Sequence, residues 1–496
     1  MTATEGNRAV RRPSLVDAVV PIVTLVVLIG GALALFGLGA LDGPLQVALV
    51  LCAMVAALVV LKNGHRWEDI QVSAQRAVAS ITSAIFILLA VGALIGTWNL
   101  SGTIPTLVYY GIQVLSPSWY YAATALICGI VAMSIGSSWT TAGTIGVGLV
   151  GIAAMLGVSP GITAGAVISG AYLGDKLSPL SETTVLTAQL VKANVYEHIK
   201  RQAWTSVPAF GIAFVLFGLI GLFWGPAPTH AGDTSSELTA LGHIYWITPI
   251  NLLPLVLLVG LSIRKTPASL ALAASAIFAG ILAPFTQYDV VRNFLADPGA
   301  GPLRAAIQAM WQAMATGFSK DSGIGDIDRL LSRGGMDSML LTLWLIIGAV
   351  TFGTILEEFG LVNRLIDPVI RAAKSTGRLY LTVFATAFGL NIVAGDQYIA
   401  LVLPAKIYRA EFARRGLAPT NLSRLTADSG TVTSPLVPWN SCGAFMAAVL
   451  GVPTLVYLPF CFFNIASPLL SVIYGCTGFK IERIEPAGSG RRDEDR

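Results

Sequence analysis

The amino-acid sequence predicts an all-α protein that crosses a lipid bilayer many times, built from two inverted-topology repeats with broken helices and re-entrant hairpins. Three observations lead to this fold class. Hydrophobic residues make up 54% of the 496 residues, whereas charged residues make up only 12%. Long apolar runs alternate with short clusters of charge, and the second half of the chain repeats polar motifs of the first. This composition excludes a set of soluble domains.

The apolar runs predict about 10 to 13 membrane segments, because a spanning helix needs roughly 20 apolar residues. We divide the chain into a cytoplasmic N-terminal tail (1–15), an N-terminal helix pair (16–62), a first repeat (77–224), a linker with additional helices and an external loop (225–337), a second, inverted repeat (338–476) and a cytoplasmic C-terminal tail (480–496).

The distribution of Lys and Arg predicts the orientation, since cytoplasmic loops carry an excess of both. Basic clusters occur at 8–12, 62–76, 192–201, 264–265, 364–378, 406–424 and 491–496, whereas 100–121 and 225–244 contain neither residue. The basic clusters are therefore predicted to lie inside and the two other stretches outside. Both termini are expected in the cytoplasm.

This orientation requires an even number of crossings in two intervals that polar residues interrupt. The interruptions are Ser134–Thr141 and Asn391–Gln397. Non-helical backbone at membrane depth is tolerated where it is buried in protein or lines a wet cavity, so two re-entrant hairpins would fit. The alternative is a pair of complete helices joined by a short loop in each interval, and helix length distinguishes the two.

The internal repeat is predicted from matching motifs at nearly equal offsets. Ser434-Pro-Leu follows Ser178-Pro-Leu by 256 residues, and Gly353-Thr follows Gly96-Thr by 257. In the predicted orientation, the segments before Gly96 and Gly353 cross the membrane in opposite directions. Inverted repeats with corresponding broken helices are a known route to alternating access around a central site.

The most informative segment is Gly174–Thr184, which lies between two apolar stretches and is too polar to face lipid. A carboxylate at the bilayer centre costs on the order of 3 kcal/mol, so its charges should face protein or water. Pro179 frees backbone carbonyls in the preceding turn. Together with these carbonyls, the segment supplies an oxygen-rich set suited to a hard cation. Its candidate site residues are Asp175, Lys176, Ser178, Glu182, Thr183 and Thr184. The alternative is a cytosolic loop in which Asp175 pairs with Lys176 or another basic group.

The corresponding segment of the second half, Asp428–Ser441, keeps the hydroxyls and prolines but lacks the pair of acids at the same register. One half is therefore expected to bind the coupling ion and the other to shape the substrate side. The candidates here are Thr433, Ser434, Trp439 and Asn440, with Asn391, Asp396 and Gln397 from the earlier break. Asp396 is interpreted either as a second proton or cation carrier or as a helix N-cap. Glu357 and Glu358 are interpreted as a helix end paired with Arg364.

Other classes of function find little support in the sequence. The net charge of +4 is spread over short clusters, so no nucleic-acid partner is expected. The five cysteines lie in or beside apolar runs and the four histidines in predicted loops, which predicts neither a disulfide framework nor a metal cluster. No nucleophile with a plausible base is visible, so we expect neither an enzyme nor a cofactor.

The segment Gly174-Asp-Lys-Leu-Ser-Pro-Leu-Ser-Glu-Thr-Thr184 strongly resembles the signature of the NhaC-type sodium/proton antiporter family. Gly92–Trp98, Ser101–Pro105 and Asn421–Asn440 resemble the family in the same order, and the resemblance covers approximately Pro13 to Ile481. It implies a secondary transporter of the bacterial inner membrane that exchanges sodium for protons, with two inverted repeats. Members of the superfamily also couple malate, lactate or amino acids to these ions. Where the family pattern has Asp-Thr-Thr-Asn, this chain has Glu182-Thr-Thr-Val185, which loses an amide and lengthens an acid.

Two hypotheses follow from the residues and the resemblance. In the first, Asp175 and Glu182 bind sodium in competition with protons, Ser178, Thr183, Thr184 and opened carbonyls complete the site, and Lys176 neutralises the second acid when neither ion is bound. In the second, the cargo is an organic anion or amino acid, recognised by Trp439, Asn440, Asn391 and Gln397. The expected partners are the lipid bilayer, a small cation, such an organic cargo and a second copy of the chain in a homodimer.

Overall fold

The computed structural model describes residues 10–223, 231–295 and 301–484. Throughout these ranges the secondary structure is helical, with two isolated β-bridges and no strand. The predicted all-α class is therefore confirmed. Parts of the two predicted tails (1–9 and 485–496) and of the predicted external loop (224–230) lie outside the described residues.

The helices follow one another along the chain in four groups. The N-terminal group contains α1 (Leu15–Phe36), η1 (Gly37–Asp42), α2 (Pro44–Lys62) and α3 (Trp67–Ser80). The next group contains α4 (Thr82–Leu100), α5 (Thr103–Val114), η2 (Pro117–Trp119), α6 (Tyr120–Ile135), α7 (Ser138–Thr141), the π-helix η3 (Ala142–Gly146), α8 (Val147–Met155), α9 (Pro160–Leu177), α10 (Glu182–Leu190) and α11 (Val195–Phe223).

The linker group contains α12 (Ala231–Ile244), η5 (Pro249–Leu252), α13 (Leu253–Ile263), α14 (Ala268–Thr286), α15 (Tyr288–Leu295), α16 (Pro302–Thr316) and α17 (Gly325–Leu331). The last group contains η6 (Asp337–Met339), α18 (Leu340–Glu358), α19 (Leu361–Ala372), α20 (Thr376–Val393), α21 (Gln397–Arg414), α22 (Pro419–Thr426), the π-helix η7 (Ala427–Thr431), η8 (Ser434–Leu436), α23 (Ser441–Leu450), α24 (Thr454–Tyr457), η9 (Leu458–Phe460) and α25 (Phe462–Thr477).

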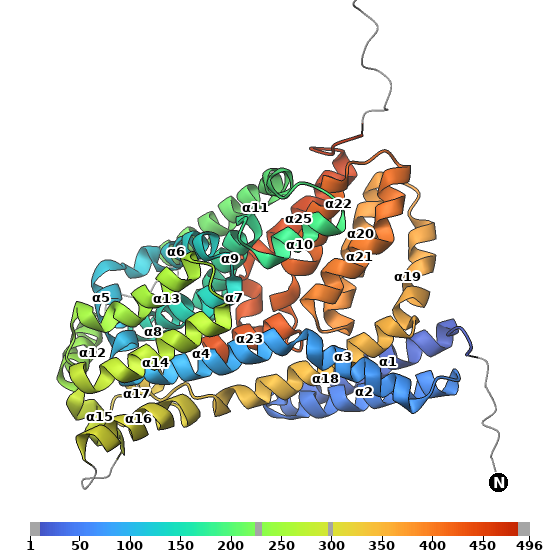
Figure 1. Ribbon diagram of the computed structural model, residues 1–496. Helices are drawn as coiled ribbons and strands as arrows, with labels where there is room; N and C mark the ends of the chain where they lie inside the picture. The colour runs from blue at the N-terminus through green and yellow to red at the C-terminus, as the bar shows by residue number, and fades with distance from the viewer. Residues whose placement is uncertain (1–9, 224–230, 296–300, 485–496) are drawn as a thin grey trace, which may run out of the picture.

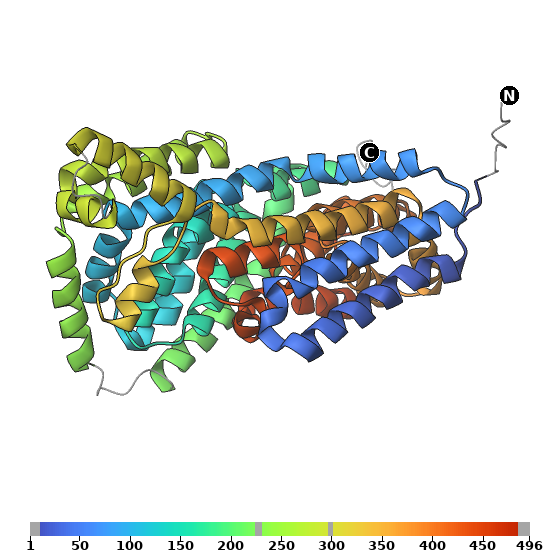
Figure 2. The ribbon, with the colours of Figure 1, turned by 90° about the horizontal axis from the view of Figure 1, so that it is seen from below.

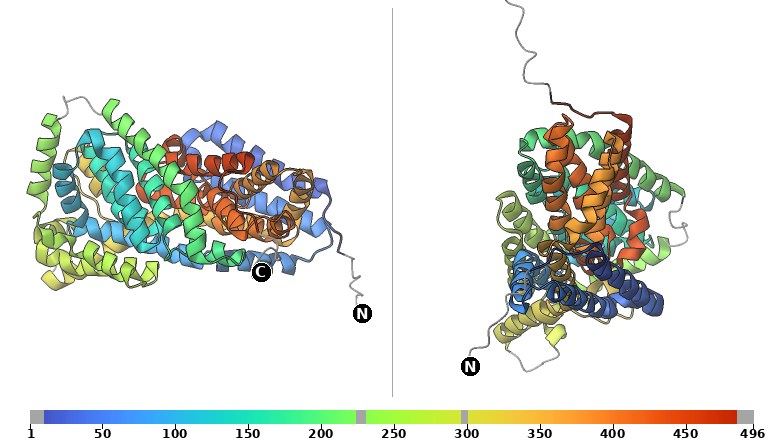
Figure 3. Two further views of the ribbon diagram at one scale, coloured as in Figure 1. Left: turned by 90° about the horizontal axis from the view of Figure 1, so that it is seen from above. Right: turned by 90° about the vertical axis from the view of Figure 1, so that its right-hand side faces the viewer.

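The two halves of the chain form separate groups of helices that meet in the middle of the molecule. Figure 1 shows α5, α6, α8 and α9 on one side and α20, α21, α22 and α25 on the other. Seen from below in Figure 2, α18 lies between α3 and α2, and it packs against both. In the left panel of Figure 3, α11 runs diagonally over the opposite face, where it packs on α6, α9 and α25.

Many of the helices are long and apolar enough to cross a membrane. In the described part of the chain there are eight such helices, or up to ten when two bent helix pairs are each counted as one span. The predicted 10 to 13 segments exceed the eight unbroken helices because several predicted spans are broken into shorter pieces. The chain is thus a multi-pass membrane protein.

Corresponding elements recur at nearly equal spacing in the two halves. Gly102 separates α4 from α5, and Gly360 separates α18 from α19; both glycines have a left-handed backbone conformation. The second helix of each pair, α5 or α19, has 12 residues. Pro160 and Pro419, which are 259 residues apart, open α9 and α22. This agreement in element order and length is consistent with the predicted internal repeat. The opposite orientation of the two repeats stays a prediction.

The helices break where the sequence predicts. A left-handed Gly136 separates α6 from α7, and a left-handed Gly395 precedes α21. In the first interval the two arms, Pro117–Ile135 and Ser138–Met155, have 19 and 18 residues. Arms of this length agree with two complete helices as well as with the two arms of a hairpin, so the hairpins stay a prediction.

Close packing of α9 against α6 fixes the position of the most polar segment. A Cβ atom added to Gly170 would lie 2.1 Å from the carbonyl oxygen of Ala125, and one added to Gly174 would lie 2.4 Å from that of Gly129. Only glycine allows this approach of the two backbones. The last turn of α9, which carries Asp175 and Lys176, is consequently held against α6.

Candidate functional site

Four helix N-termini meet at one cavity of about 970 Å³ in the middle of the molecule. They belong to α7, α10, α21 and α23, whose first residues Ser138, Glu182, Gln397 and Ser441 all line it. Each N-terminus is capped by the side chain of the preceding residue, which accepts a hydrogen bond from a backbone N–H. The capping residues are Ser137, Ser181, Asp396 and Asn440.

These caps are related in pairs by the internal repeat. Asp396 follows Ser137 by 259 residues, and Asn440 follows Ser181 by the same number. Helix N-termini carry partial positive charge from their free N–H groups. The cavity therefore receives positive potential from two helix ends of each half.

Asp175 is one of two buried acids that line the cavity, the other being Asp396. Asp175 is 6% exposed, it lines the cavity, and its Oδ2 accepts a hydrogen bond from the hydroxyl of Ser138 at 2.9 Å. Among the described residues, no Lys or Arg forms an ion pair with it. A buried carboxylate with a neutral partner is costly in its charged form, so Asp175 favours binding a proton or a cation.

Glu182 and Thr183 line the same cavity. Glu182 is exposed and lies close enough to Asp175 to act on it electrostatically. Thr183 is buried, and its hydroxyl lies 3.0 Å from that of Ser181. The two acids thus lie at different depths in the cavity: Glu182 is in contact with solvent, and Asp175 is buried further inside.

Ser178 and Thr184 do not line the cavity. Ser178 donates a hydrogen bond to the carbonyl oxygen of Met133 at 2.8 Å. The hydroxyl of Thr184 lies 3.2 and 3.1 Å from the carbonyl oxygens of Asp175 and Lys176. Thr184 therefore contacts these carbonyls from the following helix, and their predicted role in binding a cation stays a prediction.

Lys176 faces away from Asp175 and pairs with the other half of the chain. Its ammonium forms an ion pair with Asp428 in η7 and donates to the hydroxyl of Ser467 at 2.9 Å. Ser467 in turn donates to Asp428 at 2.9 Å, and both charged side chains are almost fully buried. The alternative interpretation, in which Asp175 pairs with Lys176, is therefore wrong. Sequence reasoning missed the pair because Asp428 lies 252 residues away.

Asp396 and Gln397 contribute the second half's side of the cavity. Asp396 caps α21 by accepting from the backbone N–H groups of Tyr398 at 2.8 Å and Ile399 at 3.0 Å. The N-cap interpretation is thus correct, although the residue also lines the cavity. The amide oxygen of Gln397 accepts from Ser434 at 2.9 Å and from the Cys442 thiol at 3.0 Å. Ser434 therefore holds the side chain of Gln397 in place and does not itself line the cavity.

Asn391, Thr433, Trp439 and Asn440 bind one another and the backbone instead of facing the cavity. The Asn391 amide donates to Thr433 at 3.0 Å, and that of Asn440 donates to the Asn391 side chain at 3.0 Å. The Trp439 indole donates to the carbonyl of Ile392 at 2.6 Å. These bonds fasten the end of α20 to the start of α23. The expectation that Trp439, Asn440 and Asn391 contact cargo does not match this arrangement.

Glu357 is a cavity residue that sequence reasoning assigned to a helix end. It lines the cavity beside Glu358, which pairs with Arg76 at 3.2 Å and not with the predicted Arg364. The sequence feature that could have indicated this position is the pair of acids at the end of a long apolar run. Arg76 of α3 and Lys265, which lies between α13 and α14, line the same cavity.

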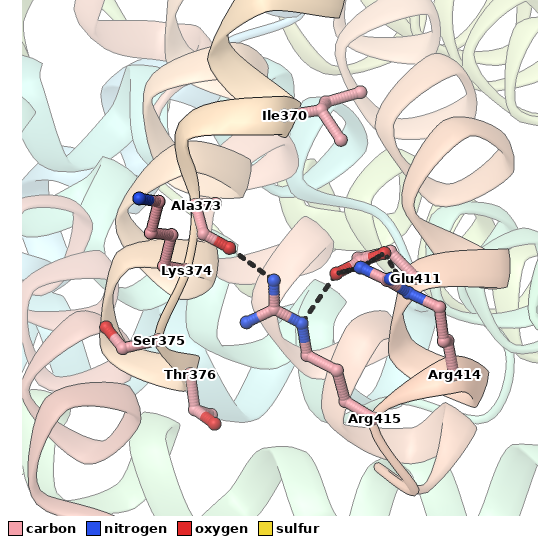
Figure 4. Close-up of a pocket in the computed structure, with 8 residues that line it drawn as sticks. All are labelled: Ile370, Ala373, Lys374, Ser375, Thr376, Glu411, Arg414 and Arg415. Carbon is pink, nitrogen blue, oxygen red and sulfur yellow. Dashed lines mark hydrogen bonds and ion pairs between the residues drawn. The ribbon is translucent and has the colours of Figure 1, made fainter.

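A second pocket, of about 600 Å³, lies where the segment between α19 and α20 meets the end of α21. Figure 4 shows Arg415, the residue that follows α21, reaching toward the carbonyl of Ala373 and toward Glu411. The carboxylate of Glu411 also accepts from Arg414 at 2.8 Å. This pocket contains none of the predicted site residues, and its carboxylate, Glu411, is paired with Arg414 and Arg415.

Comparison with known proteins gives the following similarities. The profile of the Na+/H+ antiporter family matches residues 9–189 and 170–479. The chain is 35% identical to the Na+/H+ antiporter NhaC of Alkalihalophilus pseudofirmus, over 90% of this chain and 93% of that protein. It is 33% identical to the arginine/ornithine antiporter ArcD of Halobacterium salinarum, over 98% and 96% of the two chains. It is 34% identical to the malate-2H+/Na+-lactate antiporter of Bacillus subtilis, over 88% and 90%.

Proposed function

Because this chain belongs to the Na+/H+ antiporter family, we propose that it exchanges sodium ions for protons by alternating access, with Asp175 and Glu182 as the carboxylates for which the two ions compete. One observation carries the assignment. Asp175 is a buried carboxylate that lines a central cavity, accepts a hydrogen bond from the neutral hydroxyl of Ser138 and forms no ion pair with a Lys or Arg among the described residues.

The exchange follows from the energetics of that acid. Asp175 is neutral when protonated, and it is also compensated when it holds a sodium ion. The empty anionic form is costly to move through a low-dielectric region. Either ion therefore permits the conformational change and the empty site opposes it, which couples the two fluxes. Glu182 and the Thr183 hydroxyl supply further oxygens in the same cavity, as a hard cation prefers.

In the proposed orientation the cavity opens toward the cytoplasm, because Arg76 and Lys265, which belong to two of the predicted cytoplasmic basic clusters, line it. The structure then corresponds to an inward-facing state of a bacterial inner-membrane protein with both termini in the cytoplasm. The two halves, as inverted repeats, would exchange conformations around the cavity to open it outside. A homodimer is the proposed assembly.

A second candidate is exchange of an organic anion or amino acid driven by the same ions. Two relatives carry such names, one for arginine and ornithine and one for malate and lactate. The observation that favours this candidate is the convergence of four helix N-termini on a cavity of about 970 Å³, because such ends attract carboxylates. Gln397 is the one residue of the predicted cargo-binding set that lines the cavity.

Everted membrane vesicles with an internal pH dye distinguish the candidates. After acidification of the vesicle interior by respiration, added sodium should release protons in vesicles that contain the protein, and control vesicles without it should not respond. A dye response that is insensitive to sodium, in vesicles with active and correctly oriented protein, would contradict sodium/proton exchange. Gradient-driven, saturable uptake of a labelled organic acid or amino acid would then favour the second candidate.

A further inference from the structure

An apolar groove lies at the end of the molecule where α14, α15 and α16 pack together (Figure 1). Its volume is about 600 Å³, which is within the roughly 300–1,000 Å³ of cavities that bury a small ligand. The two longer helices supply its apolar walls, with Ile281, Pro284 and Phe285 from α14 and Leu303, Ala306 and Ile307 from α16. Among its described lining residues, only Arg292 of α15 carries a charge.

The groove lies along the last turns of a membrane-spanning helix. α14 is one of the candidate spans and ends at Thr286. The candidate span α4 ends at the same level, because a Cβ atom added to Gly102 would lie 2.8 Å from the side chain of Gln287. Two neighbouring spans thus end together, as expected at a membrane surface. The apolar walls of the groove are therefore at the depth of lipid acyl chains, and Arg292 follows the end of the span.

The outer face of α16 is apolar as well. The helix has 15 residues, which are too few to span a bilayer. Its alanines at 305, 309 and 313 are buried, whereas Leu303, Ile307 and Trp311 form an exposed stripe at intervals of four residues. Leu303 is 76% exposed, and Phe285 in the opposite wall is 80% exposed. Apolar side chains gathered in this way mark a surface that lipid or another protein covers.

Close packing at the floor of the groove makes it a built feature of the fold. A Cβ atom added to Gly280 would lie 2.4 Å from the side chain of Met310, so α14 and α16 touch at this level. The walls on either side of this contact are helical and need no rearrangement to accept an alkyl chain.

The positive charge of the groove has no acidic partner. Neither Arg292 nor the exposed Arg304 at the start of α16 forms an ion pair with another described residue. The guanidinium of Arg292 lies 5.8 Å from the centre of the Tyr288 ring, and Asp289 of the same helix lines a separate, polar pocket. A guanidinium binds phosphate through paired, charge-assisted hydrogen bonds. Arg292 is thus available for an anionic group at the membrane surface.

We propose that this groove binds one anionic phospholipid, with an acyl chain between α14 and α16 and the phosphate on Arg292. Charge favours this occupant over a second copy of the chain. A twofold contact through the groove would bring the Arg292 side chains of both copies into one interface, without an acid among the described lining residues to compensate them. In the proposed orientation the lipid belongs to the outer leaflet. The site is independent of which ion or cargo the protein exchanges.

The test measures lipid binding by the full-length protein, purified in detergent and depleted of lipid. Phosphatidylglycerol and phosphatidylcholine with identical acyl chains are titrated separately, and native mass spectrometry gives the apparent Kd of the first lipid bound. Arg292→Gln removes the charge, and Ala306→Phe fills the groove.

Each variant has a matched control. Arg264→Gln changes an exposed Arg that precedes α14 at its opposite end and forms no ion pair with another described residue. Ala315→Phe enlarges an exposed Ala of α16 that lies outside the groove.

We expect the wild-type protein to bind phosphatidylglycerol about fivefold more tightly than phosphatidylcholine, as one Arg near a membrane surface contributes. Arg292→Gln should lose most of this preference and keep its affinity for phosphatidylcholine. Ala306→Phe should weaken the binding of both lipids, and both controls should match the wild type. Glycerol phosphate, which has no acyl chain, should not displace the bound lipid.

Several results would overturn the proposal. These are an unchanged preference in Arg292→Gln, unchanged lipid binding in well-folded Ala306→Phe, and displacement of the lipid by glycerol phosphate. Conversion of a dimer to a monomer by Ala306→Phe, with lipid binding unchanged, would show instead that a second copy covers the groove. Phe285→Ser decides the case if Ala306→Phe misfolds, because Phe285 is largely exposed. It should weaken the binding of both lipids, and wild-type affinities would contradict the site.

Discussion

Lys176 at the end of α9 forms an ion pair with Asp428 in η7, and this buried contact joins the two halves of the chain next to the central cavity. The pair has two consequences. Lys176 is not available to neutralise Asp175, because its charge is already paired with Asp428. In addition, loss of either charge of the pair would weaken the interface between the two halves.

Asp428→Asn should destabilise the protein strongly, because it leaves the Lys176 ammonium buried without a counter-ion. Breaking one side of a buried pair costs about 3–5 kcal/mol. The thermal unfolding temperature in detergent should fall accordingly. The double variant Lys176→Met/Asp428→Leu, which removes both charges, should recover most of the loss. An Asp428→Asn variant with wild-type thermal stability would show that the ion pair is not formed.

Gly174→Ala should disrupt the packing that positions Asp175. The added methyl group would lie 2.4 Å from the carbonyl oxygen of Gly129, so α9 and α6 have to separate. We expect a loss of stability of about 1–3 kcal/mol, as for other overpacked sites, together with loss of exchange. Gly211→Ala is the matched control, because nothing lies within 4 Å of its added methyl group. Equal thermal stability of the two variants would contradict this packing.

The sequence predicts the architecture well where local chemistry decides it. Gly136 and Gly395 lie at or beside the predicted polar interruptions, and the acids Asp175 and Glu182 do line one cavity. The contacts that the sequence does not predict depend on which helices meet. Lys176 meets Asp428 across 252 residues, and Thr184 folds back onto carbonyls of the preceding helix. No local pattern encodes either choice, because both follow from the packing of α9 against other helices.

Ser138→Ala should weaken sodium binding without unfolding the protein. The hydroxyl of Ser138 donates a hydrogen bond to Asp175 Oδ2 at 2.9 Å. A hydrogen bond to a charged group contributes about 1.5–3 kcal/mol, so the apparent KM for sodium should rise about tenfold or more. Ser134→Ala is the control, since its exposed hydroxyl bonds to the Ile130 carbonyl of its own helix at 2.9 Å. Equal KM values in the two variants would show that Ser138 does not support the site.

Asp396→Asn should leave both stability and exchange near wild type, because Asn is as good an N-cap as Asp. Asp396→Ala removes the acceptor of the Tyr398 and Ile399 N–H groups and should lower stability by about 1 kcal/mol. Thermal unfolding and proton flux, measured on the same preparations, check both expectations. Lost exchange in a well-folded Asn variant would instead identify Asp396 as a second ion carrier.

The most direct test of the central claim is sodium/proton exchange by Asp175→Asn in everted vesicles, measured across the pH range. The substitution keeps the size of the side chain and removes the charge that links the two ions. The variant should insert, elute as a single species in detergent and show no sodium-driven proton movement at any pH. A well-folded Asp175→Asn protein with the exchange rate and pH dependence of the wild type would contradict the account.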